Sequence, residues 1–126
     1  MKKSLLVFLA LPLAAQAEGF SKAQICKATV ALEMSRPVEG IAVVEDGNYP
    51  IVSYRRTDDG KRFTFSCRVS EKSQTVVWRG YLPEEQAWGR WRDGEYDAKI
   101  TFAESNGELK VTSDQAGSKT FKRNQL

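Results

Sequence analysis

Three dipeptides that favour tight turns divide this chain into hairpins. They are Gly47-Asn48, Asp59-Gly60 and Asn106-Gly107, and runs of alternating apolar and polar residues flank them. Asp-Gly and Asn-Gly accept the positive φ angles of a two-residue type I′ turn, and such alternation is typical of strands with one buried face. The sequence therefore predicts an antiparallel β meander.

The length of each turn predicts which residues face each other, because a shift of one residue exchanges the two faces of a strand. The two-residue Asp59-Gly60 turn gives the opposite pairs Arg56 with Phe63, Tyr54 with Phe65 and Val52 with Cys67. The other two turns give the pairs Val43 with Val52, Ile41 with Tyr54, Phe102 with Val111, Ile100 with Ser113, Lys99 with Asp114 and Glu104 with Leu109. Further strands are expected at 75–79, at 119–123 and near 88–92, with a loop or a single helical turn at 83–85.

One helix is expected before the strands. Ser21 has the hydroxyl of a good N-cap, residues 22–34 carry an apolar face at helical spacing, and Pro37 disfavours helix in the residue before it. Cys26 lies on the apolar side of this helix. The predicted fold is thus mainly β with one N-terminal helix, in which six to eight antiparallel strands form a curled sheet or small barrel.

The first 17 residues have the pattern of a secretory signal peptide. Lys2-Lys3 precedes an apolar run, and Ala15-Gln16-Ala17 is a small-x-small cleavage site. We expect cleavage near Ala17, which leaves residues 18–126 as a single domain in the periplasm or outside the cell. The apolar run is too short for a stable membrane span, and no longer run follows it in the mature chain.

Export also changes the charge and the cysteine chemistry. The chain has 19 basic and 16 acidic residues, a net charge of +3, and loss of Lys2 and Lys3 leaves 17 basic residues and a net charge of +1. This near neutrality argues against a nucleic-acid partner. Cys26 and Cys67 would meet oxidising conditions, so a structural disulfide that ties the helix to a strand is favoured over a reactive thiol.

Two groups of side chains are candidates for binding. The first supplies stacking faces and anion-binding groups within five positions, and it consists of Trp88, Arg90, Trp91 and Arg92. The second lies on the outer face of the Asp59-Gly60 hairpin, where guanidiniums could hold a carboxylate, a phosphate or an acidic partner, and it consists of Arg55, Arg62 and Arg68. Structural alternatives stay open: a tryptophan could fill the core beneath arginine stems, and the arginines could only solvate the strand face.

Few groups are available for catalysis. The chain contains no histidine, which removes Ser-His-Asp and Cys-His arrangements and the usual zinc sites, so neither a metal nor a cofactor is expected. Carboxylates remain, and those near turns and tryptophans are Asp58, Asp59, Glu84, Glu85, Asp93, Glu95 and Asp97. A glycosidase needs two carboxyl groups about 5–9.5 Å apart across a cleft, which spacing in sequence does not establish.

Several short motifs extend over nearly the whole mature chain. They are Ile25-Cys26-Lys27-Ala28, Tyr54-Arg55-Arg56, Asp58-Asp59-Gly60-Lys61, Phe65-Ser66-Cys67, Val77-Trp78, Gly89-Arg90-Trp91-Arg92 and Ile100-Thr101-Phe102. In this combination the chain resembles a group of small exported proteobacterial proteins of uncharacterised function. The resemblance implies a periplasmic setting and a Cys26–Cys67 bond, and it brings no activity, substrate or catalytic residue. In outline the expected architecture is also similar to periplasmic lysozyme-inhibitor barrels, an analogy of fold alone.

These observations favour a non-enzymatic periplasmic or secreted binding module, such as an inhibitor or accessory protein. Its expected partner is a protein or an anionic or carbohydrate ligand of the cell envelope, and the sequence does not predict its oligomeric state. Two alternatives stay open: a small carboxylate-dependent hydrolase of an envelope polymer, and a small-ligand carrier with an apolar cavity. The carrier would be disfavoured by a core filled with Tyr54, Phe63, Phe65, Trp78 and Phe102.

Overall fold

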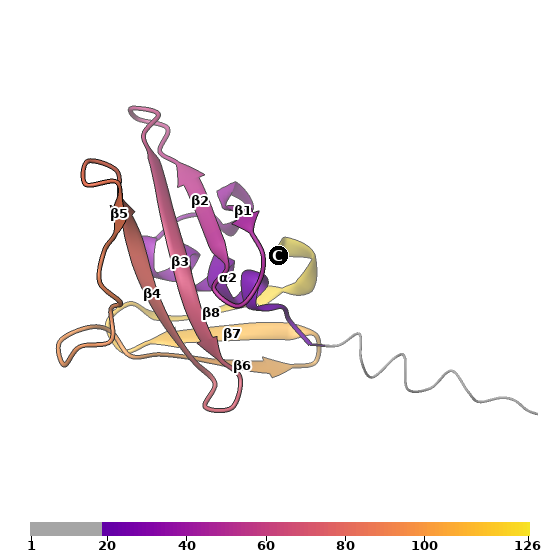
Figure 1. Ribbon diagram of the computed structural model, residues 1–126. Helices are drawn as coiled ribbons and strands as arrows, with labels where there is room; N and C mark the ends of the chain where they lie inside the picture. Colours follow the sequence, from indigo (N-terminus) through magenta and orange to yellow (C-terminus); the bar gives the residue numbers. More distant parts are fainter. Residues whose placement is uncertain (1–18) are drawn as a thin grey trace, which may run out of the picture.

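The computed structural model describes residues 19–126, which form one α-helix and an eight-stranded antiparallel sheet (Figure 1). The helix is α2 (Lys22–Met34), and the strands are β1 (Ala42–Glu45), β2 (Ile51–Arg55), β3 (Arg62–Ser70), β4 (Thr75–Leu82), β5 (Ala87–Trp88), β6 (Ile100–Ser105), β7 (Glu108–Ser113) and β8 (Gly117–Lys122). Short 3₁₀ turns cover Val38–Gly40 and Arg123–Gln125. The expected signal peptide and its cleavage site at Ala17 lie outside the described residues.

The sheet curls around the helix. Its strand order is β1-β2-β3-β4-β6-β7-β8, and β5 pairs with β4 beside this path. Strands β2 to β4 cross β6 to β8 at a steep angle, and α2 lies on the concave side in contact with β2, β3, β7 and β8 (Figure 1). This arrangement confirms the predicted fold of one N-terminal helix on a curled antiparallel sheet.

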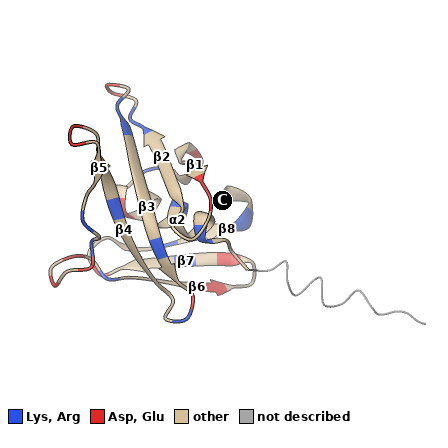
Figure 2. Cartoon of the chain, viewed as in Figure 1, with Lys and Arg blue, Asp and Glu red and all other residues tan. Residues whose placement is uncertain are grey.

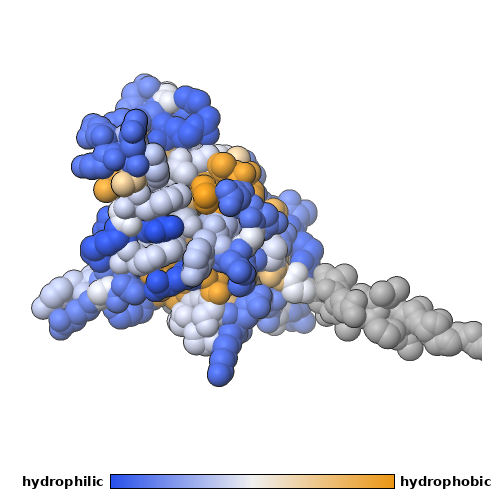
Figure 3. Space-filling view, viewed as in Figure 1, coloured by the Kyte–Doolittle hydropathy of each residue, from blue (hydrophilic) through white to orange (hydrophobic). Residues whose placement is uncertain are grey.

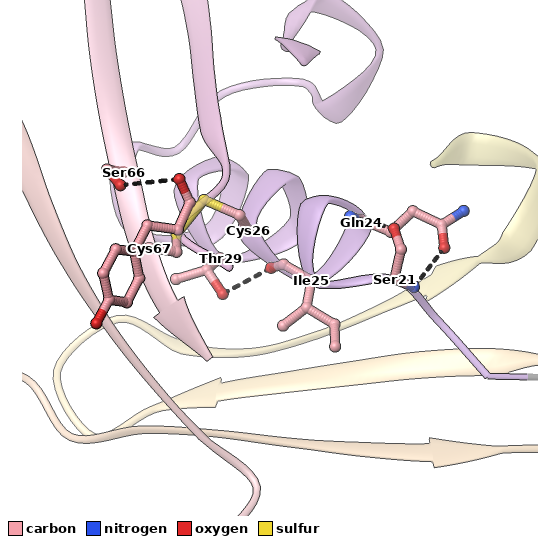
Figure 4. The surroundings of a disulfide bond; sticks show 8 residues. Ser21, Gln24, Ile25, Cys26, Thr29, Ser66 and Cys67 are labelled. Atoms are coloured by element: carbon pink, nitrogen blue, oxygen red, sulfur yellow. Dashed lines mark hydrogen bonds between the residues drawn. A yellow bond between two sulfur atoms is a disulfide. The ribbon is translucent and has the colours of Figure 1, made fainter. Parts of the chain in front are cut away.

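The helix begins and ends as its sequence predicts. The Ser21 hydroxyl accepts a hydrogen bond from the Gln24 amide at 3.1 Å, and the Gln24 side chain accepts one from the Ser21 amide at 2.9 Å, which is a reciprocal capping box. Ser35 ends the helix in a left-handed conformation with φ 53°. The buried Thr29 hydroxyl donates a hydrogen bond to the Ile25 carbonyl at 2.8 Å (Figure 4). This polar group is therefore hydrogen-bonded although it is removed from water.

A disulfide joins α2 to the middle of β3, as predicted. Cys26 and Cys67 are both fully buried, and their Cα atoms lie 5.7 Å apart (Figure 4). The bond fixes the helix against the inner face of the sheet, where apolar side chains from both layers form the core. The largest fully buried apolar side chains are Phe121, Ile25, Leu109, Val30, Val38, Val52 and Val111.

The β6–β7 hairpin has the predicted two-residue turn. Asn106 and Gly107 both adopt positive φ angles, 54° and 75°. The predicted pairs form, with Phe102 opposite Val111, Ile100 opposite Ser113 and Glu104 opposite Leu109, and two hydrogen bonds join Lys99 to Asp114 beyond the strand ends. The apolar members of these pairs point into the core.

The predicted register of the β2–β3 hairpin is wrong by two residues. Tyr54 lies opposite Phe63 and Val52 lies opposite Phe65, because the connecting loop contains four residues, 57–60, rather than two. A shift of two residues returns each side chain to its original face, so Cys67 still points toward the helix as expected.

The Asp59 side chain explains the longer loop. Its carboxylate accepts hydrogen bonds from the Lys61 amide at 3.0 Å and from the Arg56 guanidinium at 2.7 Å. The Arg56 amide also donates to the Lys61 carbonyl at 2.8 Å, and the Gly60 amide donates to the Arg56 carbonyl at 2.8 Å. These bonds stabilise a wider turn than the Asp-Gly pair alone favours.

The β1–β2 connection differs from a two-residue turn as well. Val43 lies opposite Val52 as predicted, but the register shifts between Val43 and Glu45, and the chain then turns through residues 46–50. Ile41 precedes β1 and donates its amide to the Val38 carbonyl, so the expected pair of Ile41 with Tyr54 is absent from the ladder. Val43 and Val44 of β1 are exposed hydrophobic residues, and hydrophobic atoms are visible on this face of the molecule in Figure 3.

The remaining strands differ from prediction mainly in length. β4 continues three residues past position 79, β8 covers Gly117–Lys122, and the strand expected near 88–92 is reduced to β5. Residues 83–86 form the expected turn, in which the Gln86 amide donates to the Pro83 carbonyl. Within residues 19–126, the one long helix is too short and too polar to cross a bilayer.

Candidate functional site

Residues 87–92 follow the second edge of β4. β5 pairs with the end of β4, and beyond it the Gly89 amide donates to the Gly80 carbonyl at 2.8 Å, while the Arg92 amide donates to the Trp78 carbonyl at 2.9 Å. A Cβ atom at Gly89 would lie 3.2 Å from the Gly80 oxygen, so this close approach favours glycine. The segment is therefore held to the sheet by its backbone, which fixes where its side chains point.

Two tryptophans and two arginines lie together on the outer face of the sheet. The Arg79 guanidinium carbon lies 4.8 Å from the ring centre of Trp88 and 4.2 Å from that of Trp91, and the Arg68 guanidinium carbon lies 4.7 Å from the Trp91 ring. We call Trp88, Arg79, Trp91 and Arg68 the tryptophan–arginine stack. Basic positions on the front of β3 and β4 are visible in Figure 2.

Aromatic rings extend this stack at both ends. Tyr81 contacts Trp88 edge to face, with ring centres 5.3 Å apart, and Tyr49 lies 5.7 Å from Trp91. Tyr49 is 54% exposed and Tyr81 is 37% exposed, whereas the two tryptophans are half-buried. Neither Trp88 nor Trp91 belongs to the hydrophobic core, so the stack is a surface structure rather than part of the interior.

Arg79 differs from its neighbours in its charge partners. Arg68 forms a salt bridge with Asp93 at 3.0 Å, and Arg90 forms one with Asp97 at 2.7 Å. The Arg79 side chain makes no hydrogen bond or salt bridge to any residue in 19–126, and its Nε atom is buried without a partner. Because the guanidinium donors lie in the plane of the group, rings above and below still leave its edge able to bind an oxygen atom.

Salt bridges account for two of the carboxylates that the sequence suggested for catalysis. A hydrogen bond from Arg90 and one from the Gly94 amide lower the pKa of Asp97 to about 2. The Arg56 guanidinium, together with the Lys61 amide, holds the pKa of Asp59 well below its usual range. A general acid needs the opposite shift, so these two groups serve as ion-pair partners. In residues 19–126, no three acidic or cysteine side chains gather as a group that could hold a metal ion.

The structure separates the predicted binding residues into four places. Trp88, Trp91 and Arg68 meet in the stack, whereas Arg90 turns to Asp97 and the Arg92 guanidinium lies 5.2 Å from the Trp78 ring on the inner face. The remaining two lie at the hairpin end of β2 and β3, where Arg55 donates to the Gly60 carbonyl and Arg62 donates to the Ser53 hydroxyl.

The selection from sequence omitted Arg79, which holds the centre of the stack. The signal was present: Arg79 alternates with the inward-facing Trp78 along β4 and lies opposite Ser66 in the β3–β4 ladder. Alternation predicts its face, but its contact with Trp88 and Trp91 depends on how residues 89–92 return along the strand edge.

Comparisons with known proteins identify no relative. No protein-family model, no curated protein and no solved structure matches this chain.

Proposed function

We propose that this protein is a non-enzymatic binding module of an oxidising compartment, and that its tryptophan–arginine stack binds an anionic partner from the cell envelope. The Cys26–Cys67 disulfide supports an exported, oxidising setting. The periplasm or the exterior of the cell is the location that the predicted signal peptide favours.

One observation carries this proposal: Arg79 lies between two indole rings without a salt-bridge partner among residues 19–126. A guanidinium stacked on aromatic rings is held in place before binding, which lowers the entropy lost when a ligand binds. Half-buried tryptophans supply apolar contact area beside that charge, and tryptophan and arginine dominate the energy of many interfaces. The chemistry suits a carboxylate-bearing carbohydrate or an acidic protein surface.

The test uses the oxidised mature protein as bait for an envelope extract. Wild-type protein is compared with Trp91→Ala and Arg79→Gln, and Lys110→Gln serves as a matched control because it removes one exposed positive charge from β7. We expect both stack variants to weaken binding by about 2 kcal/mol, roughly 30-fold, and the control to retain it. Thermal midpoints are measured for all four proteins, so that loss of fold is not mistaken for loss of binding.

The nature of the partner is then resolved by titration. Tryptophan fluorescence is followed while an oligogalacturonate or a Glu-rich peptide is added to the protein at low and high salt. Binding that weakens with salt and with Arg79→Gln supports an anionic ligand at the stack. Retention of the same captured partner by Trp91→Ala and Arg79→Gln would refute the proposal. The hydrolase stays a prediction, and loss of an envelope polymer during incubation would support it.

A further inference from the structure

The inner face of the sheet carries a second feature, an aromatic cleft. It lies where the β2–β3 and β4–β5 connections extend past the helix (Figure 1), and its volume is about 510 Å³. Its apolar lining comes from α2 and three strands and includes Met34, Tyr54, Phe63, Phe65, Trp78 and Tyr81. Trp78 and Arg79 are adjacent in β4 and point to opposite faces, so the cleft and the tryptophan–arginine stack lie on opposite faces of this strand. Tyr81, which contacts Trp88, also lines the cleft.

The rings of the cleft form one continuous surface. The Tyr54 ring centre lies 5.4 Å from that of Phe63 and 5.9 Å from that of Phe65, and the Phe65 ring lies 5.7 Å from Trp78. Phe65 is buried in the core, whereas Tyr54, Phe63 and Trp78 are half-buried. Of the five aromatic side chains whose burial would disfavour a carrier, Phe65 and Phe102 are buried in the core, whereas Tyr54, Phe63 and Trp78 are half-buried. These three line the open cleft together with Phe65.

Positive charge surrounds this apolar surface. Guanidinium carbons lie over three of its rings, with Arg36 4.8 Å from Tyr54, Arg56 5.0 Å from Phe63 and Arg92 5.2 Å from Trp78. Arg56 is paired with Asp59, but the side chains of Arg36 and Arg92 make no hydrogen bond or salt bridge to any residue in 19–126.

The charge balance of the lining favours an anion. Besides Arg56 and Arg92, the cleft is lined by Lys61 and Arg62, and its acidic lining residue is Glu84. An apolar ligand alone would leave Arg92 and Lys61 without an anionic partner, and an inorganic anion alone would leave the rings exposed to water. A ligand that satisfies both needs an apolar body joined to an anionic head.

We propose that the aromatic cleft binds a small amphiphilic anion as a monomer. Its apolar body lies on Tyr54, Phe63 and Trp78, and its carboxylate, sulfonate or phosphate head is bound by Arg92 or Arg36. The cleft is open rather than enclosed, so the head remains near water while the body is covered. This gives the carrier alternative a definite site, on the face opposite the stack.

The test compares two fluorescent probes of nearly the same shape. The first, 8-anilinonaphthalene-1-sulfonate, carries a negative head, and the second, N-phenyl-1-naphthylamine, lacks it. We expect saturable binding of one sulfonate per oxidised protein, and about tenfold weaker binding of the neutral probe. Equal affinity for the two probes would overturn the proposal, because the cations would then contribute nothing.

Variants locate the probe. Arg92→Gln is expected to weaken sulfonate binding about tenfold and to leave the neutral probe unchanged, and Phe63→Ala is expected to weaken both probes. Arg79→Gln is the matched control, because it removes the same charge from the opposite face. If Arg79→Gln leaves the affinity for the sulfonate probe unchanged, the result supports a binding site in the cleft. If Arg79→Gln and Arg92→Gln weaken sulfonate binding equally, the proposal is overturned. Thermal midpoints near the wild-type value exclude probe binding to a partly unfolded state.

Competition defines the apolar body and the physical form of the ligand. Laurate tests an acyl chain and 2-naphthoate tests a planar ring, with monolaurin as the neutral counterpart of laurate. Displacement of the sulfonate by either monomeric anion, and not by monolaurin, supports the proposal. Binding to phosphatidylglycerol vesicles without binding of any monomeric anion would overturn it in favour of a membrane surface.

Discussion

Loss of the Cys26–Cys67 disulfide should lower the free energy of unfolding by about 4 kcal/mol. The bond joins residues 41 positions apart, and closure of a loop of that length removes roughly 13 cal/mol/K of entropy from the unfolded chain, which is about 4 kcal/mol at 25 °C. A domain of this size has a total stability of about 5–15 kcal/mol. The loss is therefore a large fraction of the whole and should be plain in any equilibrium measurement.

The assay is urea unfolding followed by far-ultraviolet circular dichroism. Oxidised wild-type protein is compared with wild-type protein in a phosphine reductant and with the Cys26→Ala/Cys67→Ala double variant. Alanine is chosen because both positions are fully buried, where serine hydroxyls would lack partners at a cost of about 1–3 kcal/mol each. The double variant in reductant controls for effects of the reductant itself.

Two quantities should change together. The urea concentration at the unfolding midpoint should fall, because stability is lost. The slope of the unfolding free energy against urea concentration should become steeper, because an unfolded chain without the bond exposes more surface. The double variant should be somewhat less stable than the reduced protein, since it also loses two buried sulfur atoms. If complete reduction leaves both midpoint and slope unchanged, the loop-closure reasoning is refuted.

Three further predictions follow from burial, turn geometry and charge. Phe121→Ala should lower stability by about 3–5 kcal/mol in urea unfolding, because the ring is fully buried. Gly107→Ala should cost about 1–2 kcal/mol in the same assay, because its φ of +75° disfavours a side chain; Gly40→Ala, which has equal space and no positive φ, is the control. Asp97→Asn should reduce the loss of stability in acid, because the folded pKa of about 2 lies below the unfolded value of about 3.9.

The sign of the last effect follows from that order of pKa values. Ionised Asp97 stabilises the fold above pH 4, and its contribution is lost as the pH falls from about 4 to about 2. Wild type and Asp97→Asn should therefore differ at pH 7 and converge at pH 2, and a constant difference across that range would contradict the assignment. A loss of stability below about 1 kcal/mol in Phe121→Ala would contradict the argument from burial. Equal losses in Gly107→Ala and Gly40→Ala would contradict the argument from turn geometry.

Short-range signals in the sequence predicted the elements that depend on neighbours in the chain. The capping box at Ser21 and the positive φ angles of Asn106 and Gly107 are local, and both the helix and the β6–β7 register agree with prediction. The prediction of a two-residue turn at Asp59-Gly60 was wrong for an equally specific reason. There the Asp59 carboxylate binds Arg56 and stabilises a four-residue loop, a side-chain effect that the dipeptide alone does not reveal.

The candidate site was predictable in composition and less so in arrangement. The sequence indicated Trp88 and Trp91 in one candidate group and Arg68 in another, and the structure places all three within one stack. The sequence did not show that Arg79 lies at the centre of the stack. It also did not show that Arg90 pairs with Asp97 or that Arg92 lies on the other face. These outcomes depend on the return of residues 89–92 along β4, which is a contact between segments rather than a pattern within one.

The register shift in β1 affects how two copies of this protein can meet. β1 is the outermost strand of its side of the sheet, and a regular strand at that position would offer a row of free amide and carbonyl groups to another molecule. The register shift between Val43 and Glu45 interrupts that row after a few residues, and the acidic Glu45 and Asp46 follow directly. Intermolecular sheet extension is thereby opposed at the strand that exposes two valines, Val43 and Val44.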